Sequence, residues 1–256
     1  MYRTINMNKE RNICAIILAA GRGSRMKSGD KNKVTMLLHD KPLISYSVNL
    51  LEEMNIYPII VVVGHAKESV QAVLKDRKVE FIEQLNPLGT GHAVLTGIAK
   101  VPLDATDVVV LYGDDSYLYS KDVLKKIIDT HIMEGADLTL LTIKVDNPQG
   151  LGRVVRSEDG GIESIIEEKD ANEEQKKIKE INPNCYIFRA EFLRNYLPEI
   201  EKSPVTGEYY LPALIEIALA KNKIIKVIDG GYLPWKGVNT REELEEAKEL
   251  LSSIKK

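Results

Sequence analysis

A glycine-rich loop near the start of the chain carries groups that could hold a phosphate. The loop LAAGRGSRM covers residues 18–26 and follows an apolar run, ICAII. Gly21 and Gly23 would let backbone N–H groups approach an anion, as such groups do in anion-binding turns. Arg25, and Lys33 further along, would supply positive charge. The same residues also suit a tight strand-to-helix turn whose arginines face solvent.

Two common nucleotide-binding fingerprints do not describe this loop. No GKS or GKT follows the glycines, so it is not a Walker A loop. Met26 stands where the third glycine of G-x-G-x-x-G would be, and Asp40 precedes a helical pattern instead of ending a strand. The sequence therefore argues against an NAD-dependent oxidoreductase of the usual dinucleotide-binding type.

Two adjacent carboxylates end another apolar run. The residues VVVL lead into YGDD at positions 112–115. Because Mg²⁺ prefers one or two carboxylates together with phosphate oxygens and water, Asp114 is a candidate magnesium ligand. Paired acids of this kind also occur in ordinary turns.

The stretch QLNPLGTGHA, residues 84–93, carries groups that suit a nucleobase. The amide of Gln84 can both donate and accept, as recognition of a pyrimidine edge requires. Gly89 would let a ring approach the backbone, and Thr90 adds a hydroxyl. The alternative interpretation is a loop that caps a helix.

Apolar runs alternate with helical patterns along the first half of the chain. The runs are apolar almost throughout, as expected of parallel strands covered on both faces. This order predicts an α/β fold with a Rossmann-like, mostly parallel sheet and helices on both faces. Ligands of such sheets bind beyond the carboxyl ends of the strands, where all three stretches lie. The predicted strands are 13–19, 57–64, 79–84, 107–115, 136–147 and 180–190, and the predicted helices are 42–54, 67–75, 89–100, 208–221 and 240–253.

The second half of the chain has looser connections. The stretches GLGRVVR and GIESIIEEKD predict additional sheet, and the charged residues 171–177 predict a solvated helix surface. Thr240 and Glu243 have the spacing of a capping box and mark the start of the last helix.

Composition limits the possible functions further. The chain has 256 residues, of which 44% are hydrophobic and 29% charged, with a net charge of −3. This composition is ordinary for a globular protein with one large core, and the negative charge disfavours nonspecific binding to nucleic acid. Cys14 and Cys185 predict buried thiols, not a zinc site. Because residues 1–12 are polar and no apolar run could span a membrane, we expect a cytoplasmic protein without a membrane partner.

The three stretches together resemble, in order and spacing, the sugar-nucleotide pyrophosphorylases. The family patterns L-A-A-G-x-G-[ST]-R-M, Q-x-x-x-x-G-T-x-H-A and Y-G-D appear here as LAAGRGSRM, QLNPLGTGHA and YGD. The chain is most similar to the uridylyltransferase domain of the bifunctional bacterial enzymes that make UDP-N-acetylglucosamine. The likeness continues through GLGRVVR, IIEEKDA, EIN, GEYY and GVN, and covers residues 13–250.

The resemblance implies a role for individual residues. Arg25, Lys33 and Asp114 would be catalytic, and Asp114 and Asn239 would bind Mg²⁺. It further implies that Leu18, Ala19, Ala20, Gly21 and Gly23 line the nucleotide, that Gln84, Gly89 and Thr90 read the uracil, that Tyr112 and Gly113 lie near the ribose, and that Gly152, Glu167 and Asn182 hold the amino sugar.

The activity that the resemblance implies is Mg²⁺-dependent transfer of UMP from UTP to N-acetylglucosamine 1-phosphate. The products would be UDP-N-acetylglucosamine and pyrophosphate, a step in nucleotide-sugar and cell-envelope biosynthesis. Two alternatives stay open, namely transfer to another sugar 1-phosphate or from dTTP, and a nucleotide-sugar binding protein without turnover.

The implied organisation is a single nucleotidyltransferase domain with a smaller, sugar-binding β lobe. A polar extension over residues 1–12 would precede a domain over 13–256. That domain would comprise a nucleotide-binding lobe at 13–115, a sugar-binding lobe at 116–238 and a C-terminal helix at 239–256. No hexapeptide repeat of the bifunctional enzymes' acetyltransferase domain occurs in this sequence, so we expect no acetylation activity. The resemblance leaves the oligomeric state open.

The chain departs from the family pattern at three places within the site. Asn32 replaces the proline before the lysine and one residue is inserted, so Lys31 rivals Lys33 as the phosphate contact. Asp115 and Ser116 replace an apolar residue and a proline, and we expect Asp115 to face solvent. Pro183 and Asn184 replace Thr-Gly after the asparagine of the sugar site, which puts the identity of the sugar in question.

Overall fold

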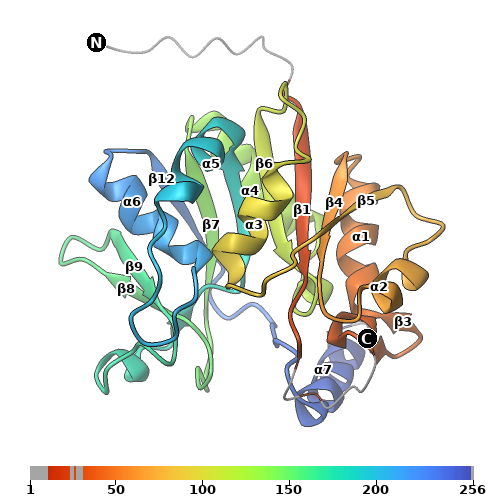
Figure 1. Cartoon of the computed structure of the whole chain (residues 1–256). Coiled ribbons are helices and arrows are strands. Elements are labelled where there is room, and N and C mark those ends of the chain that lie inside the picture. The colour runs from red at the N-terminus through yellow and green to blue at the C-terminus, as the bar shows by residue number, and fades with distance from the viewer. Residues whose placement is uncertain (1–10, 24–25, 27–30, 255–256) are drawn as a thin grey trace.

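Ten strands of the described residues, which are 11–23, 26 and 31–254, form one continuous sheet (Figure 1). This computed structural model also has a separate two-stranded ribbon, β2 with β3. The strands are β1 Ile13–Ala19, β2 Leu37–Leu38, β3 Lys41–Pro42, β4 Ile59–Val63, β5 Val79–Glu83, β6 Asp107–Tyr112, β7 Leu138–Lys144, β8 Arg153–Arg156, β9 Ile162–Ile166, β10 Glu180–Ile181, β11 Cys185–Arg189 and β12 Ile225–Asp229.

The sheet is mixed but mostly parallel. Its strand order is β5-β4-β1-β6-β11-β7-β10-β8-β9, with β12 paired to β7. Strands β5, β4, β1 and β6 run parallel, as do β7 and β12, while β11 lies antiparallel between β6 and β7. At the far end, β8 and β9 form an antiparallel hairpin that projects beside α6 (Leu214–Ala220) (Figure 1). The predicted α/β class with a Rossmann-like sheet is confirmed.

Helices cover both faces of the sheet because consecutive strand residues alternate between two apolar cores. In β1, Cys14, Ile16 and Leu18 face one core, and Ala15, Ile17 and Ala19 face the other. The first core also contains residues of α3, α5 and α6, and the second contains residues of α1, α2 and α4. The helices are α1 Leu43–Glu53, α2 Lys67–Val73, α3 Thr90–Ile98, α4 Lys121–Met133, α5 Ala190–Tyr196, α6 Leu214–Ala220 and α7 Arg241–Ile254.

Several elements differ from the sequence predictions. The predicted strand 180–190 is interrupted by Pro183, which cannot donate to a sheet ladder, and by Asn184, whose φ is 60°. The helix expected from residue 208 begins at Leu214, after a 3₁₀ turn that contains Pro212. The charged run 171–177 forms only a 3₁₀ turn over its last three residues.

Two helices, α4 and α5, were not predicted. The signals for α4 are nevertheless present in the sequence. Ser120 caps the helix by accepting from the backbone N–H of Val123 at 3.2 Å. Leu124, Ile127 and Ile128 are buried at helical spacing along one face.

The carboxyl ends of the four parallel strands meet at one edge of the sheet. The register aligns Leu18 of β1 with Tyr112 of β6, and Ala19 of β1 with Val63 of β4. The glycine-rich loop, the start of QLNPLGTGHA and the YGDD turn therefore leave the sheet side by side.

At the opposite edge of the sheet, residues at the start of the described chain contact the beginning of β6. The N–H of Asn12 donates to Thr106 Oγ1 at 3.1 Å, the carbonyl of Asn12 accepts from the N–H of Thr106, and Arg11 pairs with Asp107 at 3.1 Å. These two residues thus pack against the fold, and residues 1–10 of the predicted extension lie outside the described residues. No helix within the described part of the chain is long and apolar enough to cross a membrane.

Candidate functional site

A cavity of about 1010 Å³ opens along the carboxyl edge of the parallel strands. It reaches from the glycine-rich loop to the β8–β9 hairpin and is at the upper end of the range for small-molecule sites. Of the predicted site residues, Gly23 and Gly113 lie outside its lining, and Arg25 lies outside the described residues. The predicted residues that line it are Leu18, Ala19, Ala20, Gly21, Lys33, Gln84, Gly89, Thr90, Tyr112, Asp114, Gly152, Glu167, Asn182 and Asn239.

Three polar side chains from distant parts of the sequence converge in this cavity. The ammonium of Lys33 forms an ion pair with Asp114 Oδ2 and donates to Asn239 Oδ1 at 3.0 Å. The side chains of Lys33 and Asp114 are only 15% and 14% exposed. Lys31, the rival considered from the sequence, is exposed and does not line the cavity.

The segment that carries Asn239 is attached at both ends. The backbone N–H of Val238 donates to the carbonyl of Asp114 at 3.3 Å. The predicted capping box of α7 is confirmed, because Glu243 N–H donates to Thr240 Oγ1 and Thr240 N–H donates to Glu243 Oε2. The same carboxylate accepts from the N–H of Asn239 at 2.6 Å, so the helix cap also positions this residue.

Asp114 and Asn239 have the chemistry of a partial magnesium site. Their side-chain oxygens converge on a single point, the Lys33 ammonium. Hard oxygen donors suit Mg²⁺, which commonly takes one or two carboxylates and completes its shell with phosphate oxygens and water. Within residues 11–23, 26 and 31–254, no cluster of three or more His, Cys, Asp or Glu could hold a metal ion. A magnesium ion here would therefore draw its other ligands from a substrate and water.

The glycine-rich loop is held in place by Asn32, which the sequence showed only as a departure from the family. Its buried Nδ2 lies within hydrogen-bond distance of the carbonyls of Ala19, Gly21 and His65, at 3.0, 3.3 and 2.8 Å. Its Oδ1 accepts from the backbone N–H of Val34 at 3.2 Å. Asn32 thereby joins the loop directly to the turn that carries Lys33.

The conformation of Gly23 gives the stem of Lys33 its place. Gly23 has a φ of +55°, and a Cβ atom there would lie 3.0 Å from Lys33 Cβ. A larger residue would therefore be strained and would press on the lysine. Arg22 is exposed and lines the cavity.

The QLNPLGTGHA stretch forms the next part of the wall. Gln84 is buried, and its Nε2 donates to the carbonyl of Gly89 at 3.2 Å and lies 2.8 Å from His92 Nδ1. Gly89 has a φ of +107°, and a Cβ atom there would lie 2.5 Å from the carbonyl oxygen of Tyr209. The hydroxyl of Thr90 accepts from the N–H of Leu211 at 3.0 Å. These contacts fix the shape of the loop where a base was expected to bind.

Tyr112 and Gly113 continue β6 into the site in different ways. Tyr112 lines the cavity, and burial raises the pKa of its hydroxyl well above the ordinary value. Gly113 does not line the cavity; its N–H donates to the carbonyl of Leu18 at 3.0 Å, and a Cβ atom on it would lie 3.2 Å from Val34 Cγ1. Gly113 thus closes the strand end, and its predicted place near the ribose stays a prediction.

The β8–β9 hairpin brings Gly152 and Glu167 together at the far side of the cavity. The Glu167 carboxyl carbon lies 3.7 Å from where a Cβ of Gly152 would stand. Burial, with the nearby charges of Asp170 and Glu208, raises the pKa of Glu167 to about 7. At neutral pH this side chain therefore offers both the protonated and the ionised form for contact with a ligand.

Arg153 supports this side of the cavity and was not singled out from the sequence. It is 1% exposed and donates to the carbonyl of Leu151 and to Glu168 Oε2, the latter at 2.6 Å. Glu168 Oε2 also accepts from the N–H of Gly150 at 3.0 Å. Arg153 thus links the loop before β8 to the segment after β9.

The turn at residues 182–184 differs most from expectation. Asn182 Nδ2 donates to the carbonyl of Leu141 at 2.7 Å, and its Oδ1 accepts from the N–H of Asn184 at 3.2 Å. The expectation that Asp115 faces solvent is wrong, since it is 3% exposed and Asn184 Nδ2 donates to its Oδ2 at 2.6 Å. Burial and the charge of Asp114 raise the pKa of Asp115, opposed by the Asn184 bond and by Lys33.

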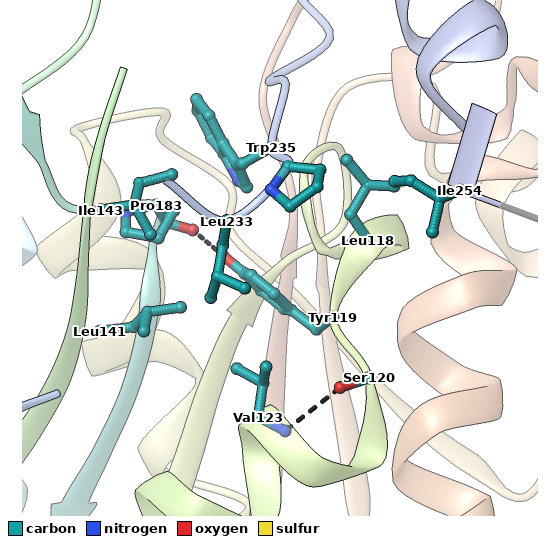
Figure 2. Close-up of a pocket in the computed structure, with 11 residues that line it drawn as sticks. Leu118, Tyr119, Ser120, Val123, Leu141, Ile143, Pro183, Leu233, Trp235 and Ile254 are labelled. Carbon is teal, nitrogen blue, oxygen red and sulfur yellow. Dashed lines mark hydrogen bonds between the residues drawn. The ribbon is translucent and has the colours of Figure 1, made fainter. Parts of the chain in front are cut away.

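A second, apolar pocket of about 190 Å³ lies behind this turn (Figure 2). Pro183 forms part of its wall, and the hydroxyl of Tyr119 donates to the Pro183 carbonyl. Trp235 lines both this pocket and the large cavity. The turn is therefore the partition between the two hollows.

Comparison with known proteins identifies the family. The MobA-like NTP transferase domain matches residues 15–194. The chain belongs to this family. The family is one of nucleotidyltransferases, and the arrangement of phosphate-compatible groups at the strand ends agrees with that chemistry.

Several curated relatives are proteins named bifunctional protein GlmU. Those of Francisella tularensis subsp. novicida strain U112 and subsp. tularensis strain SCHU S4 are each 43% identical over 233 residues. These matches cover 91% of this chain and 50% of the relative. The chain thus spans about half the length of the curated relatives it matches.

A solved structure shares the fold. It is a proposed glucose-1-phosphate thymidylyltransferase of Bacillus anthracis, solved in complex with sucrose. The TM-score is 0.76 at 21% sequence identity, and the match covers 93% of this chain and 94% of the other. The α/β nucleotidyltransferase fold is therefore common to both.

Proposed function

We propose that this chain transfers UMP from UTP to N-acetylglucosamine 1-phosphate in a Mg²⁺-dependent reaction that releases pyrophosphate. The observation that carries the proposal is the convergence of Lys33, Asp114 and Asn239 in the large cavity. The 43% identity to proteins named bifunctional protein GlmU supports the choice of substrates.

The chemistry asks mainly for positioning and positive charge. An oxygen of the sugar phosphate attacks the α-phosphorus of UTP and forms a new P–O bond. The bond from that phosphorus to the bridging oxygen breaks, and pyrophosphate leaves with the electron pair. Because both reactants are anions, the site must hold them in line and offset their charge. No covalent nucleophile on the protein is needed.

Lys33 is the proposed positive group in contact with the phosphates. In our proposal Arg25 acts with it, and Asp114 and Asn239 would hold Mg²⁺, which would supply further positive charge for the reaction. The contacts of the Lys33 ammonium with Asp114 and Asn239 support a role for these three side chains in one site.

The remaining cavity residues divide between the two substrates. Gly21 and its neighbours would face the nucleotide, and Gln84, Gly89 and Thr90 form the proposed uracil side. Tyr112 lies on the proposed ribose side. Gly152, Glu167 and Asn182 form the proposed sugar side. This division follows the order of the strand ends across the sheet, from β5 and β1 through β6 to the β8–β9 hairpin.

A pyrophosphate-release assay with matched substrate pairs tests the proposal. UTP, dTTP, ATP, CTP and GTP would each be combined with N-acetylglucosamine, glucose, glucosamine and N-acetylgalactosamine 1-phosphates, with Mg²⁺ or with EDTA. We expect the highest kcat/KM for UTP with N-acetylglucosamine 1-phosphate, and no release in EDTA. Turnover restricted to another pair would refute the substrate assignment. Nucleotide-sugar binding in calorimetry without release by any pair would instead show a binding protein.

A further inference from the structure

Asp115 and Asn184, two residues that depart from the sugar-nucleotide pyrophosphorylase pattern, are hydrogen-bond partners in the structure. They are 69 residues apart, and Asn184 Nδ2 donates to Asp115 Oδ2 at 2.6 Å. The pattern has an apolar residue at the first position and glycine at the second, neither of which could form this bond. The two departures are therefore one feature of the site.

This pair borders the large cavity between the catalytic and sugar sides. Both residues line it, together with Asp114 and Asn182. Asp115 is 3% exposed, whereas Asn184 is half-buried and so retains surface toward the cavity. A side chain now occupies the position where the family pattern has none.

The turn that carries Asn184 is held at each of its three residues. Asn182 is bonded to the carbonyl of Leu141, and the Pro183 carbonyl accepts from Tyr119 (Figure 2). The backbone N–H of Asn184 donates to Asn182 Oδ1 at 3.2 Å, and its side chain is bonded to Asp115. Such a turn presents the amide of Asn184 in one orientation before any ligand binds, which lowers the entropy cost of a contact.

The orientation of the amide decides which atom meets a ligand. Because the NH₂ group of Asn184 is directed at Asp115, the carbonyl oxygen Oδ1 is left as the acceptor on the other side. An acceptor fixed at the cavity wall selects for a ligand group with a proton to donate, such as a hydroxyl or an amide N–H.

We propose that Asn184 is a specificity-determining residue for the sugar 1-phosphate, and that Asp115 is the positioning residue that directs its carbonyl oxygen into the cavity. The inference rests on the proposed function and deepens it. The second substrate would carry a hydrogen-bond donor on its sugar ring at this point, and an analogue that lacks the donor would be bound less well.

The first test replaces Asn184 with glycine. Asn184 has a φ of +60°, a conformation that glycine adopts without strain, so the backbone should be preserved. We expect KM for the sugar 1-phosphate to rise about 3- to 10-fold, the usual value of one hydrogen bond, with KM for UTP and kcat within about 2-fold. Asn222→Gly is the matched control, since Asn222 also has a positive φ, of 52°, and is exposed outside the cavity.

The second test asks whether Asp115 acts through Asn184. Asp115→Val should raise the same KM by a similar factor, and Asp115→Asn, which keeps an acceptor oxygen, should restore most of the loss. The double variant Asp115→Val with Asn184→Gly should be no worse than Asn184→Gly alone. A rise in the Mg²⁺ or UTP requirement of Asp115→Val, in place of the sugar KM, would mean that Asp115 acts through Asp114, and would overturn the inference.

A third test identifies the donor on the sugar. N-acetylglucosamine 1-phosphate and its 3-, 4- and 6-deoxy analogues, with glucose 1-phosphate, would be compared on the wild type and Asn184→Gly. One analogue should show equal KM on both proteins, because it lacks the group that Asn184 contacts. An unchanged sugar KM in Asn184→Gly, with an active wild type, overturns the inference alone. A wild type without turnover on any substrate pair overturns the proposed function and the inference together.

Discussion

The two ends of β6 carry charged clusters in opposite circumstances. At the start of the strand, Asp107 is 0% exposed and contacts Arg11, Thr106 and His131, the last at 3.2 Å from its Oδ1. Beyond the other end, Asp114 is paired with Lys33, and both side chains keep some exposure to a large cavity. One strand thus joins a closed cluster to an open one.

The two clusters differ in whether their polar groups are available to bind a ligand. His131 is bonded on both sides, to Asp107 and, at 2.9 Å, to Thr139, so the buried cluster is satisfied within the protein. Lys33 has three donors, and its two partners are both candidate metal ligands. We infer that the first cluster stabilises the fold and that the second serves the reaction.

The largest expected effect comes from breaking the closed cluster. Asp107→Ala removes one side of a buried charge network, and such changes cost about 3–5 kcal/mol of unfolding free energy. Urea unfolding would measure the loss, and the protein that remains folded at low temperature should keep its kcat. Asp107→Asn, which retains part of the hydrogen bonding, should lose less. A large loss of kcat in fully folded Asp107→Ala protein would contradict the division.

The same cluster should also make stability depend on acid. Burial by itself would raise the pKa of Asp107, but the hydrogen bonds of His131 and Thr106 and the charge of Arg11 outweigh it and hold the pKa below 3.8. A depressed pKa means that this stabilisation is present above pH 3.8 and is lost as the pH falls through the folded value. Asp107→Asn should therefore reduce the acid sensitivity of unfolding.

The open cluster should give the opposite result. Lys33→Ala and Asp114→Ala should each lower kcat/KM by about 10² to 10³, roughly 3–4 kcal/mol of barrier, because each removes charge or alignment at the reacting phosphates. The melting temperature should change by no more than a few degrees. Steady-state kinetics and calorimetry on the same samples check both statements. A variant with near-normal kcat and KM would remove that residue from the mechanism.

A smaller effect is expected from the acid on the sugar side. The pKa of Glu167, about 7 and above its ordinary 4.5, means that the folded state keeps this proton when the unfolded state has lost it. The contribution of the Glu167 proton to the unfolding free energy is therefore fully present below pH 4.5 and is lost as the pH rises through about 7. In urea unfolding, the wild type should lose about 1–3 kcal/mol of unfolding free energy between pH 4.5 and 7 through this group, and Glu167→Gln should not show this loss. Parallel slopes in wild type and variant would refute it.

The smallest effect concerns the helix cap behind Asn239. Thr240→Ala should cost about 1 kcal/mol of unfolding free energy, the usual value of a cap. It should also lower kcat/KM a few-fold, because the helix cap that positions Asn239 is weakened. Ser120→Ala is the matched control, since it removes the cap of α4 and Ser120 does not line the large cavity. Equal activity losses in the two variants would show that the α7 cap has no special connection to the site.

The predictability of the fold followed the apolar runs. The strand 13–19 was predicted with its observed bounds because each of its residues must be covered on one of two faces. The long run 180–190 was misjudged, since its Asn-Pro-Asn interruption is short and lies within an otherwise apolar pattern. The helix α4 was overlooked although its cap and apolar spacing are visible.

Site residues could be predicted where the chemistry of the side chain itself suggests what it binds. Lys33 and Asp114 were placed on chemical grounds, and their proximity across the fold agrees with that placement. Asn32 and Arg153 were missed because their task is to bond to backbone carbonyls, and nothing in the sequence says which carbonyls lie near. The exposure of Asp115 was misjudged for the same reason, since its partner Asn184 arrives from a distant turn.

Nucleotide transfer at the open cluster can be tested by comparing two proteins in one assay. Pyrophosphate release would be followed with UTP, N-acetylglucosamine 1-phosphate and Mg²⁺ for wild type and Lys33→Ala of equal melting temperature. We expect steady release by the wild type and a rate about 10² to 10³ lower in the variant. Equal rates in the two proteins, or no release by a folded wild type, would contradict it.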